Sequence, residues 1–464
     1  MLLFITNGKH SSIDITGVCD DSKSLSLFSL DQIKKYYYKG HRLHMIDKSY
    51  HLSGDKYYYQ FKVIESFSLF DLDTYTKFGL NIIDNEHIID IASREGNMDF
   101  LNWWIENDIN LKYSEKSLDD ASNYGRINVL NWWHNCNLPL KYSKNSTNFI
   151  SGIKLESEDK IKVLDWWYNS GLKIIHDESS MDNASRRGEF EILNWWLNSG
   201  LDLKYSKNAI NDASMFGKIN ILNWWFNSGL ELKYSKIAID YTSIYGNIDA
   251  LNWWINSNLP LKYSNLSIDS LCDDVLIQEE IFFINILSWW KNSGLELKYS
   301  NKCMDDYSEY GYIEALEWWK NSGLELKYSE NAIINASDPK VLQWWLDSEL
   351  PLKYNNKAID WCSDIKILRW WFKSGLPLYY TERSIDSAFS NNRDDILQLW
   401  IESGLEIKHS PHSTWPKSKN SYPRKAIKWW ENSPLSQDYL KNIIKIEIDF
   451  DLTIKSVNII NNNE

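Results

Sequence analysis

The 464-residue chain has few of the features that mark secreted or membrane-spanning proteins. Its five cysteines are scattered and none stands in a Cys-x-x-Cys pair, which favours free thiols in a reducing compartment. The first ten residues lack the basic flank of a signal peptide. No apolar run approaches the roughly 18 residues of a transmembrane helix. We therefore expect an intracellular protein, located in the cytoplasm, that does not associate with a membrane.

Positive charge and catalytic motifs are also scarce. Fifty Lys and Arg residues stand against 63 Asp and Glu residues, for a formal net charge of −13. A general nucleic-acid surface needs clustered Lys and Arg, so we expect no nucleic-acid partner. The chain has no Gly-x-x-x-x-Gly-Lys-Ser/Thr loop, no Gly-x-Gly-x-x-Gly after a strand and no His-Glu-x-x-His motif. We predict that it is not an enzyme and holds no metal and no cofactor.

Tryptophan, in contrast, is abundant and ordered along the chain. Most Trp-Trp pairs stand in one recurring phrase, Leu-Asn-Trp-Trp-x-Asn-Ser-Gly-Leu-x-Leu-Lys-Tyr-Ser. The eleven pairs begin at Trp103, Trp132, Trp166, Trp195, Trp224, Trp253, Trp289, Trp318, Trp344, Trp370 and Trp429. The commonest gap between neighbouring pairs is 29 residues (for example 132 − 103 = 29). A fixed period of about 20–50 residues indicates stacked structural repeats.

One unit, residues 205–233, predicts two helices joined by a glycine turn. Ser206 is a good N-cap, because its hydroxyl can accept a hydrogen bond from an unpaired helix N–H. Gly217 ends the first helix by adopting a left-handed backbone. The second helix carries the Trp pair, is apolar on several sides and ends at Gly229. An extended segment then leads to the next cap.

The unit resembles an ankyrin repeat. The segment 210–232 aligns without gaps with the family pattern from the Leu of Thr-Pro-Leu-His to Gly-Ala-Asp-Val, with Gly217 as the inter-helix Gly and Trp224-Trp225 in place of the Leu-Leu pair. The resemblance covers roughly residues 60–435. The chain is similar to the Trp-Trp-rich, ankyrin-like families of giant DNA viruses that infect amoebae. The period is shorter than the family's usual length of about 33 residues. This implies shortened β-turn fingers, and Thr-Pro-Leu-His itself is absent.

We therefore predict an all-α, ankyrin-like helical-repeat solenoid of about a dozen repeats. Residues 1–60 are expected to form an N-terminal cap or small mixed region, and their tyrosine runs indicate short strands or a mixed cap. Residues 61–435 hold the repeats, and residues 436–464 form a C-terminal cap or tail. The terminal repeats are degenerate: the segment 74–79 has no tryptophan, and Trp400 stands alone.

The Trp-Trp pairs have two interpretations. Their ring faces could form a stacking platform for carbohydrates or bases. Core packing is favoured, because consecutive helical residues point about 100° apart. One Trp of a pair can then contact the first helix of its own repeat while the other contacts a neighbouring repeat.

A carboxylate recurs near the start of the first helix, and the residue after it varies. The carboxylates are Asp90, Asp119, Asp182, Asp240, Asp269, Asp305, Asp360 and Asp386, with Asn211 and Ile334 as exceptions. We favour a structural role for them over an acidic stripe for a basic partner, because the helix dipole stabilises acids at this position. The candidate partner-binding residues are the variable ones: Asp120, Asn183, Asp212, Tyr241, Asp306, Asn335, Trp361 and Ser387, with Ser270 at the same position. Trp361 is either an exposed anchor or an ordinary packed aromatic residue.

These observations favour a non-enzymatic protein–protein interaction scaffold whose partner is a protein that the sequence does not identify. A viral origin would direct it at host proteins. The alternatives are a structural or assembly repeat protein with no dedicated ligand, and an enzyme with its site in residues 1–60 or between repeats. The sequence indicates no oligomeric state.

Overall fold

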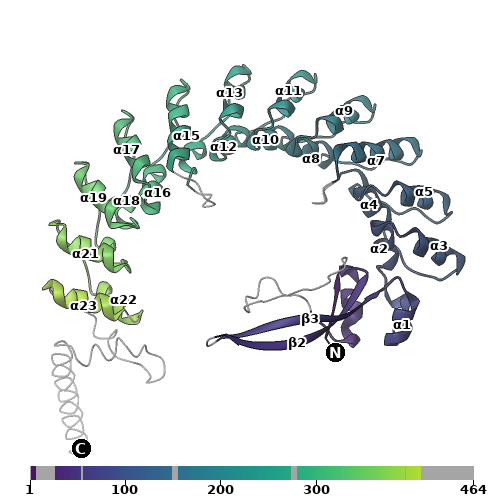
Figure 1. The fold of residues 1–464 in the computed structure, drawn as a ribbon. Coiled ribbons are helices and arrows are strands. Elements are labelled where there is room, and N and C mark those ends of the chain that lie inside the picture. The colour runs from purple at the N-terminus through teal and green to yellow at the C-terminus, as the bar shows by residue number, and fades with distance from the viewer. Residues whose placement is uncertain are drawn as a thin grey trace, which may run out of the picture. The chain divides into compact units, whose positions relative to one another are not determined.

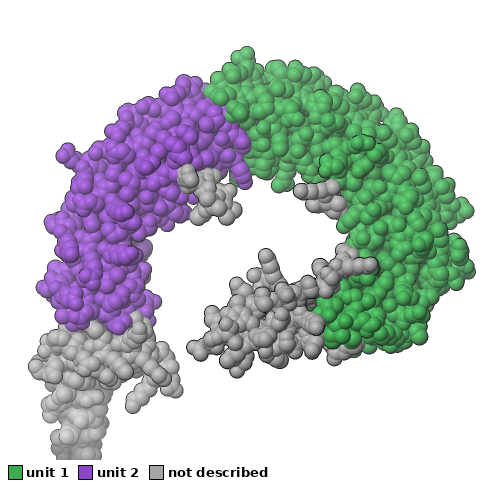
Figure 2. All heavy atoms as spheres, in the orientation of Figure 1, with its two compact units in different colours: residues 1–242, 249–262 green, residues 243–248, 263–464 purple. Residues whose placement is uncertain are grey.

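The computed structural model describes residues 2–6, 27–53, 56–148, 155–272, 280–391 and 393–408. The predictions for the last Trp-Trp pair and for residues 436–464 lie outside these residues. The chain divides into two compact units. Unit 1 is residues 1–242 with 249–262, and unit 2 is residues 243–248 with 263–464 (Figure 2).

The N-terminal part of unit 1 is a three-stranded antiparallel sheet in the order β1-β2-β3, with a 3-10 helix. The elements are β1 (Leu2–Thr6), η1 (Leu30–Lys39), β2 (Arg42–Ser53) and β3 (Lys56–Ser68). Ile33 and Tyr37 lie four residues apart on η1 and are both buried. The tyrosine run near residue 57 lies in β3, as predicted, whereas the run near residue 36 lies in η1 and not in a strand. Because β3 spans residue 60, the boundary predicted there falls inside a strand.

Helix pairs follow, one pair per repeat (Figure 1). The first helices are α2 (Ile88–Glu95), α4 (Lys116–Asn123), α6 (Asn145–Asn148), α8 (Ser179–Arg187), α10 (Asn208–Met215), α12 (Ile237–Ile244), α14 (Leu266–Asp269), α16 (Lys302–Tyr310), α18 (Asn331–Ile334), α20 (Lys357–Asp360) and α22 (Arg383–Ser390). The second helices are α3 (Met98–Glu106), α5 (Ile127–Asn135), α7 (Ser157–Asn169), α9 (Phe190–Asn198), α11 (Ile219–Asn227), α13 (Ile248–Asn256), α15 (Glu280–Asn292), α17 (Ile313–Asn321), α19 (Pro339–Asp347), α21 (Ile365–Lys373) and α23 (Asp394–Ser403). Within each unit the first helices form the inner row and the second helices the outer row. The predicted all-α repeat fold is confirmed for the described part of the chain.

The predicted helix boundaries are confirmed in the unit 205–233. The Ser206 hydroxyl accepts a hydrogen bond from the Asn208 amide at 3.1 Å, at the start of α10. Gly217 (φ 63°) and Gly229 (φ 76°) both have left-handed backbones at the ends of the two helices. Where a repeat lacks glycine after its second helix, a polar residue adopts the same left-handed conformation: Asp108, Asn137, Asn258 and Glu349.

The second Trp of each described pair lies in the core of the repeats, which confirms the packing prediction for it. These rings are at most 1% exposed at Trp133, Trp167, Trp196, Trp225, Trp254, Trp290, Trp319, Trp345 and Trp371. The first Trp is half-buried in most repeats and sits edge-on to the second; the Trp224 and Trp225 ring centroids are 4.9 Å apart with planes at 90°. The pair therefore fills the core with one ring and covers its rim with the other.

The predicted degenerate units also fold as helices. α1 (Leu72–Phe78) ends at the left-handed Gly79 and is followed by a 3-10 turn, η2 (Ile82–Asp84). At the other end, α23 buries Trp400 and ends at the left-handed Gly404. Both lack a Trp-Trp pair but keep the glycine that ends a second helix.

Candidate functional site

The recurring carboxylates join consecutive repeats. Asp119 accepts hydrogen bonds from the Ser143 amide at 2.8 Å and the Ser143 hydroxyl at 2.5 Å, where the next first helix begins. Asp90, Asp182, Asp269, Asp305 and Asp360 bind the following cap residue in the same way. Burial raises the pKa of Asp119 and of Asp182. The structural role predicted for these carboxylates is confirmed, and we call them the carboxylate ladder.

The exception at position 211 shows what the ladder requires. Asn211 Oδ1 accepts from the Ser235 amide at 3.0 Å, and Asn211 Nδ2 donates to the Ser235 hydroxyl at 3.0 Å. A hydroxyl can either donate or accept, so it adapts to an amide partner. The position needs an oxygen for the Ser235 N–H, and a negative charge is not essential.

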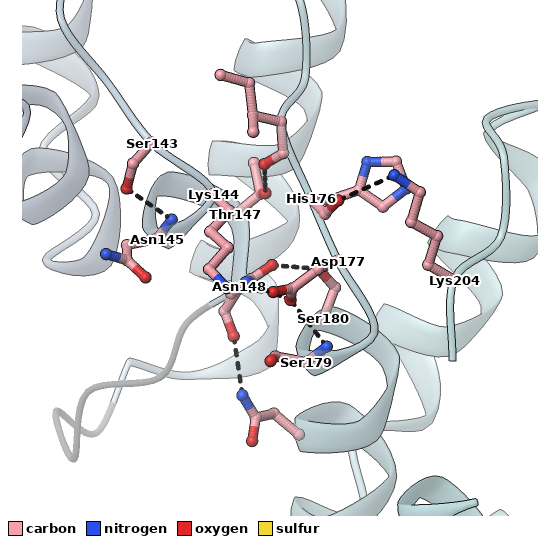
Figure 3. A network of polar contacts seen from close by, with 12 residues as sticks. Ser143, Lys144, Asn145, Thr147, Asn148, His176, Asp177, Ser179, Ser180 and Lys204 are labelled. Atoms are coloured by element: carbon pink, nitrogen blue, oxygen red, sulfur yellow. Dashed lines mark hydrogen bonds and ion pairs between the residues drawn. The ribbon is translucent and has the colours of Figure 1, made fainter. Parts of the chain in front are cut away.

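Sequence reasoning missed one member of the ladder, Asn148, which Figure 3 shows. Its Nδ2 donates to Asp177 Oδ1 at 2.8 Å, so here the amide is on the ladder and the carboxylate is at the cap. Lys144 completes the contact with an ion pair to Asp177 at 2.5 Å. The 34-residue gap between Trp132 and Trp166 hid this position. The sequence feature that could have revealed Asn148 is Asp177, which is acidic where the described ladder contacts of the other repeats have a serine or threonine cap.

A second set of contacts fixes the extended segment between consecutive repeats. Lys233 Nζ donates to the Tyr205 carbonyl at 3.5 Å and lies 4.3 Å from the Tyr205 ring centroid. The Tyr205 hydroxyl donates to the Glu231 carbonyl at 3.1 Å. The same lysine-over-tyrosine contact recurs at Lys141, Lys262, Lys298, Lys327, Lys353 and Lys408. In most repeats one lysine therefore lies along this side, which net charge does not reveal.

The indole N–H groups of the Trp pairs are also bound to the preceding repeat. Trp225 Nε1 donates to the buried Ser185 hydroxyl at 3.0 Å, and Trp224 Nε1 donates to Asn194 Oδ1 at 2.7 Å. Equivalent bonds occur at Trp132, Trp133, Trp166, Trp167, Trp253, Trp254, Trp344 and Trp345. These tryptophans stabilise repeat interfaces, so their geometry does not favour the stacking-platform interpretation.

The candidate partner-binding residues, one per repeat, lie on the first helices or, for Asn335 and Trp361, directly after them. Asp120, Asn183, Asp212 and Tyr241 belong to unit 1, and Asp306, Asn335, Trp361 and Ser387 belong to unit 2. Tyr241 (39%), Trp361 (54%) and Asn335 are exposed, and the others are half-buried. Ser270, at the same position, is buried with 7% exposure. Consecutive first helices contact one another from α2 to α10 in unit 1 and from α14 to α22 in unit 2, so the candidates of these repeats form one row in each unit.

Several of these side chains already have neighbours that hold them. Asp306 forms an ion pair with Lys302, one turn earlier on α16. Asn335 Nδ2 donates to Glu309 Oε2 at 3.3 Å. Burial raises the pKa of Asp120, and the nearby Arg94 opposes this shift. Burial likewise raises the pKa of Asp212.

The two interpretations of Trp361 are now distinguished by its exposure. The side chain lies at the end of α20 and is 54% exposed. Lys357 Nζ is 4.9 Å from its ring centroid, and the Arg383 guanidinium carbon is 5.5 Å away. Trp361 is therefore an exposed aromatic residue beside two cations and does not belong to the core.

Two classes of site are not found in the described part of the chain. No group of three or more His, Cys, Asp or Glu side chains there is arranged to hold a metal ion. None of the helices there has the length and apolar character that spanning a bilayer requires.

Comparisons with known proteins give a short sequence match and weak structural likenesses. No protein-family model matches the chain. An uncharacterized protein, L696, of Acanthamoeba polyphaga mimivirus is 58% identical over 40 residues, which are 9% of this chain and only 13% of that protein. The pentatricopeptide repeat protein PPR10 from maize is 12% identical with a TM-score of 0.27, over 81% of this chain and 60% of that chain. The same protein in complex with an 18-nt psaJ RNA element matches with the same TM-score, over 80% of this chain and 62% of that chain.

The expectation that nucleic acid is not a partner must be corrected. It rested on the net charge of −13, yet the matched solved structures include a helical-repeat protein in complex with RNA. The expectation failed because net charge sums the whole surface and does not determine the charge of any one side. The row of lysines between repeats is such a local feature. At a TM-score of 0.27 the likeness does not transfer RNA binding to this chain.

Proposed function

We propose that this chain is a non-enzymatic, ankyrin-like repeat scaffold that binds a protein partner through the exposed residues of its first helices. One observation carries the proposal. The carboxylate ladder and the Trp contacts are nearly constant, whereas the residue after each ladder position changes from Asp120 to Tyr241 to Trp361. A constant frame with a varied surface is how repeat proteins form extended binding surfaces.

The ankyrin-like assignment is part of the proposal. It is supported by the helix–glycine–helix unit and by a Trp-Trp pair at the family's Leu-Leu position. The 40-residue match to a mimivirus protein supports a viral source, an intracellular location and a host protein as partner. The division into a cap (1–60), repeats (61–435) and a C-terminal cap or tail (436–464) belongs to the same proposal.

The proposal is tested by charge reversal on matched surfaces of unit 1. In one variant Asp120 and Asp212, on first helices, become lysine. In the control Asp99 and Asp249, exposed on the first turns of second helices α3 and α13, become lysine. Both variants change the net charge by the same amount, and circular dichroism checks that both keep their helices.

Each full-length variant is used to capture cross-linked proteins from an amoeba lysate. We expect the first variant to lose a protein that the wild type and the control both retain. If all three capture the same proteins in the same amounts, the first-helix surface of unit 1 is not the binding surface. A structural repeat protein with no dedicated ligand is the alternative favoured by that result.

A further inference from the structure

The repeat pattern changes on α20 and α22, at the end of the described part of unit 2. In two earlier repeats a lysine at the start of the first helix is followed by an acid one turn later; Lys302 forms an ion pair with Asp306 on α16. Lys116 and Asp120 have the same spacing on α4. On α20, the residue at the same spacing after Lys357 is Trp361, which is not an acid.

The cations beside Trp361 are not neutralised by ion pairs. Within the described residues, neither Lys357 nor Arg383 forms one, and each side chain lies near the Trp361 ring instead. The ladder carboxylate of the same helix, Asp360, is 2% exposed and accepts hydrogen bonds from the Thr381 amide at 2.8 Å and hydroxyl at 2.7 Å. Glu382 is exposed beside Arg383 in the sequence and Asp386 lies three residues after it on α22, so the positive charge is confined to the two cations beside the Trp361 ring.

A second departure from the repeat lies in the segment leading into α22. Most repeats carry a lysine before the conserved tyrosine, whereas this one carries Tyr379, which is 52% exposed. The Tyr379 ring is 5.7 Å from the Tyr354 ring, and both line a hollow with Lys408. The same repeat therefore has exposed aromatic residues at two positions: one is an acid in three other described repeats (Asp120, Asp212 and Asp306), and the other is a lysine in most repeats.

We infer that the surface formed by Lys357, Trp361 and Arg383 binds an acidic peptide segment of a partner protein, with one apolar side chain of the peptide against the Trp361 ring. The inference rests on the proposed function and names the chemistry of the partner. Arg383 can hold a carboxylate through two N–H groups, and Lys357 supplies a second positive charge. Exposed Trp and Arg side chains are the residue types that most often dominate the energy of a protein interface.

An acidic peptide fits the neighbouring residues better than a nucleic-acid strand does. Single strands bind along a basic track with a stacked base at each step. The equivalent positions in neighbouring repeats are Asn335 on α18 and Ser387 on α22, with Asp306 beyond α18. The cations form a single cluster, which matches one or two carboxylates and not a run of phosphates.

The test measures fluorescence anisotropy of a labelled short peptide, rich in glutamate with one central phenylalanine, on the full-length protein. We expect Trp361→Ala, and separately the double change Lys357→Gln with Arg383→Gln, to weaken binding about tenfold or more. The matched controls are Tyr310→Ala, an exposed aromatic residue on α16, and Lys302→Gln at the position equivalent to Lys357. These controls are expected to bind like the wild type.

Three outcomes overturn the inference. They are unchanged binding in Trp361→Ala, equal binding of a peptide with glutamine in place of glutamate, and tighter binding of a labelled oligouridine that the same substitutions abolish. The last would assign the cluster to RNA. Loss of peptide binding in the controls as well would place the peptide elsewhere. Partner capture through the unit 1 surface is measured independently, so this inference can fail while the proposed function holds.

Discussion

At the scale of single residues, ladder carboxylates such as Asp119 and indole N–H groups such as that of Trp225 have partners in the adjacent repeat. The Asp119 carboxylate is 4% exposed and accepts two hydrogen bonds from Ser143. Burial raises its pKa, so the charged form is held at an energetic cost that these hydrogen bonds offset in part. Asn211 shows that a neutral amide makes the same two contacts without that cost.

We therefore predict that two substitutions of Asp119 differ in their effect on the unfolding free energy. Asp119→Ala should lower the unfolding free energy by about 1–3 kcal/mol, because it leaves the buried Ser143 amide without an acceptor. Asp119→Asn should stay within about 1 kcal/mol of the wild type, because it retains an acceptor. Denaturant titrations followed by circular dichroism measure both, and equal losses would show that the charge itself is required.

The pH dependence of this pair has a defined sign. The folded pKa of Asp119 is raised, so the folded state binds more protons than the unfolded state just above the usual pKa. Stability from this group is therefore present at low pH and is lost as pH rises through the raised value. The wild type should lose stability relative to Asp119→Asn as pH rises from the usual aspartate range through the raised pKa of Asp119.

At the scale of the helix pair, the glycine between the two helices and the glycine after the second helix have different surroundings. Gly246 and Gly229 both have left-handed backbones, at φ 71° and 76°. A Cβ atom at Gly246 would overlap the Phe282 ring of the next repeat, whereas a Cβ at Gly229 would have no atom within 4 Å. The turn inside a repeat is thus also part of the interface between repeats.

We predict that Gly246→Ala costs more than Gly229→Ala. Both pay about 1–2 kcal/mol for the left-handed backbone. Gly246→Ala adds roughly 1–3 kcal/mol of overpacking against Phe282. Thermal unfolding should rank the two, and adding Phe282→Ala to Gly246→Ala should recover part of the loss. If the two alanine variants unfold alike, the Phe282 contact is unimportant.

At the scale of the whole molecule, stability should be a sum over neighbouring repeats. Trp225 in unit 1 and Trp345 in unit 2 each donate an indole hydrogen bond to a buried serine hydroxyl. Trp196 is equally buried, but its Nε1 has no hydrogen-bond partner among the described residues. The three positions therefore separate the hydrogen bond from the ring packing.

We predict that Trp225→Phe and Trp345→Phe have additive effects. Each should lose about 1–3 kcal/mol beyond the loss of Trp196→Phe, which removes an unpaired donor. The double variant should equal the sum within about 0.5 kcal/mol, because the sites share no contacts. Chemical denaturation of the four variants tests this, and a Trp196→Phe loss as large as that of Trp225→Phe would contradict the hydrogen-bond account.

The sequence predicted what depends on neighbours in the chain and missed what depends on neighbours in space. Ser206, Gly217 and Gly229 act through their own helix, so capping rules located the helix pair. The partner of Trp225 is Ser185, 40 residues away, and such a pairing depends on how repeats stack. Asn148 was missed because an insertion hid its register. The exposure of Trp361 likewise required the packed structure.

The contacts between repeats are also directional. At most ladder positions the preceding repeat supplies the acceptors, such as the Asp119 carboxylate and the Ser185 hydroxyl, and the following repeat supplies the donors, such as the Ser143 amide and Trp225 Nε1. Most repeats thus carry donors on the side that faces the preceding repeat and matching acceptors on the side that faces the following one. An in-frame duplication or deletion of one whole 29-residue period would join surfaces that already match. A gene of this kind can therefore gain or lose copies, and so change the length of its product, without evolving a new interface.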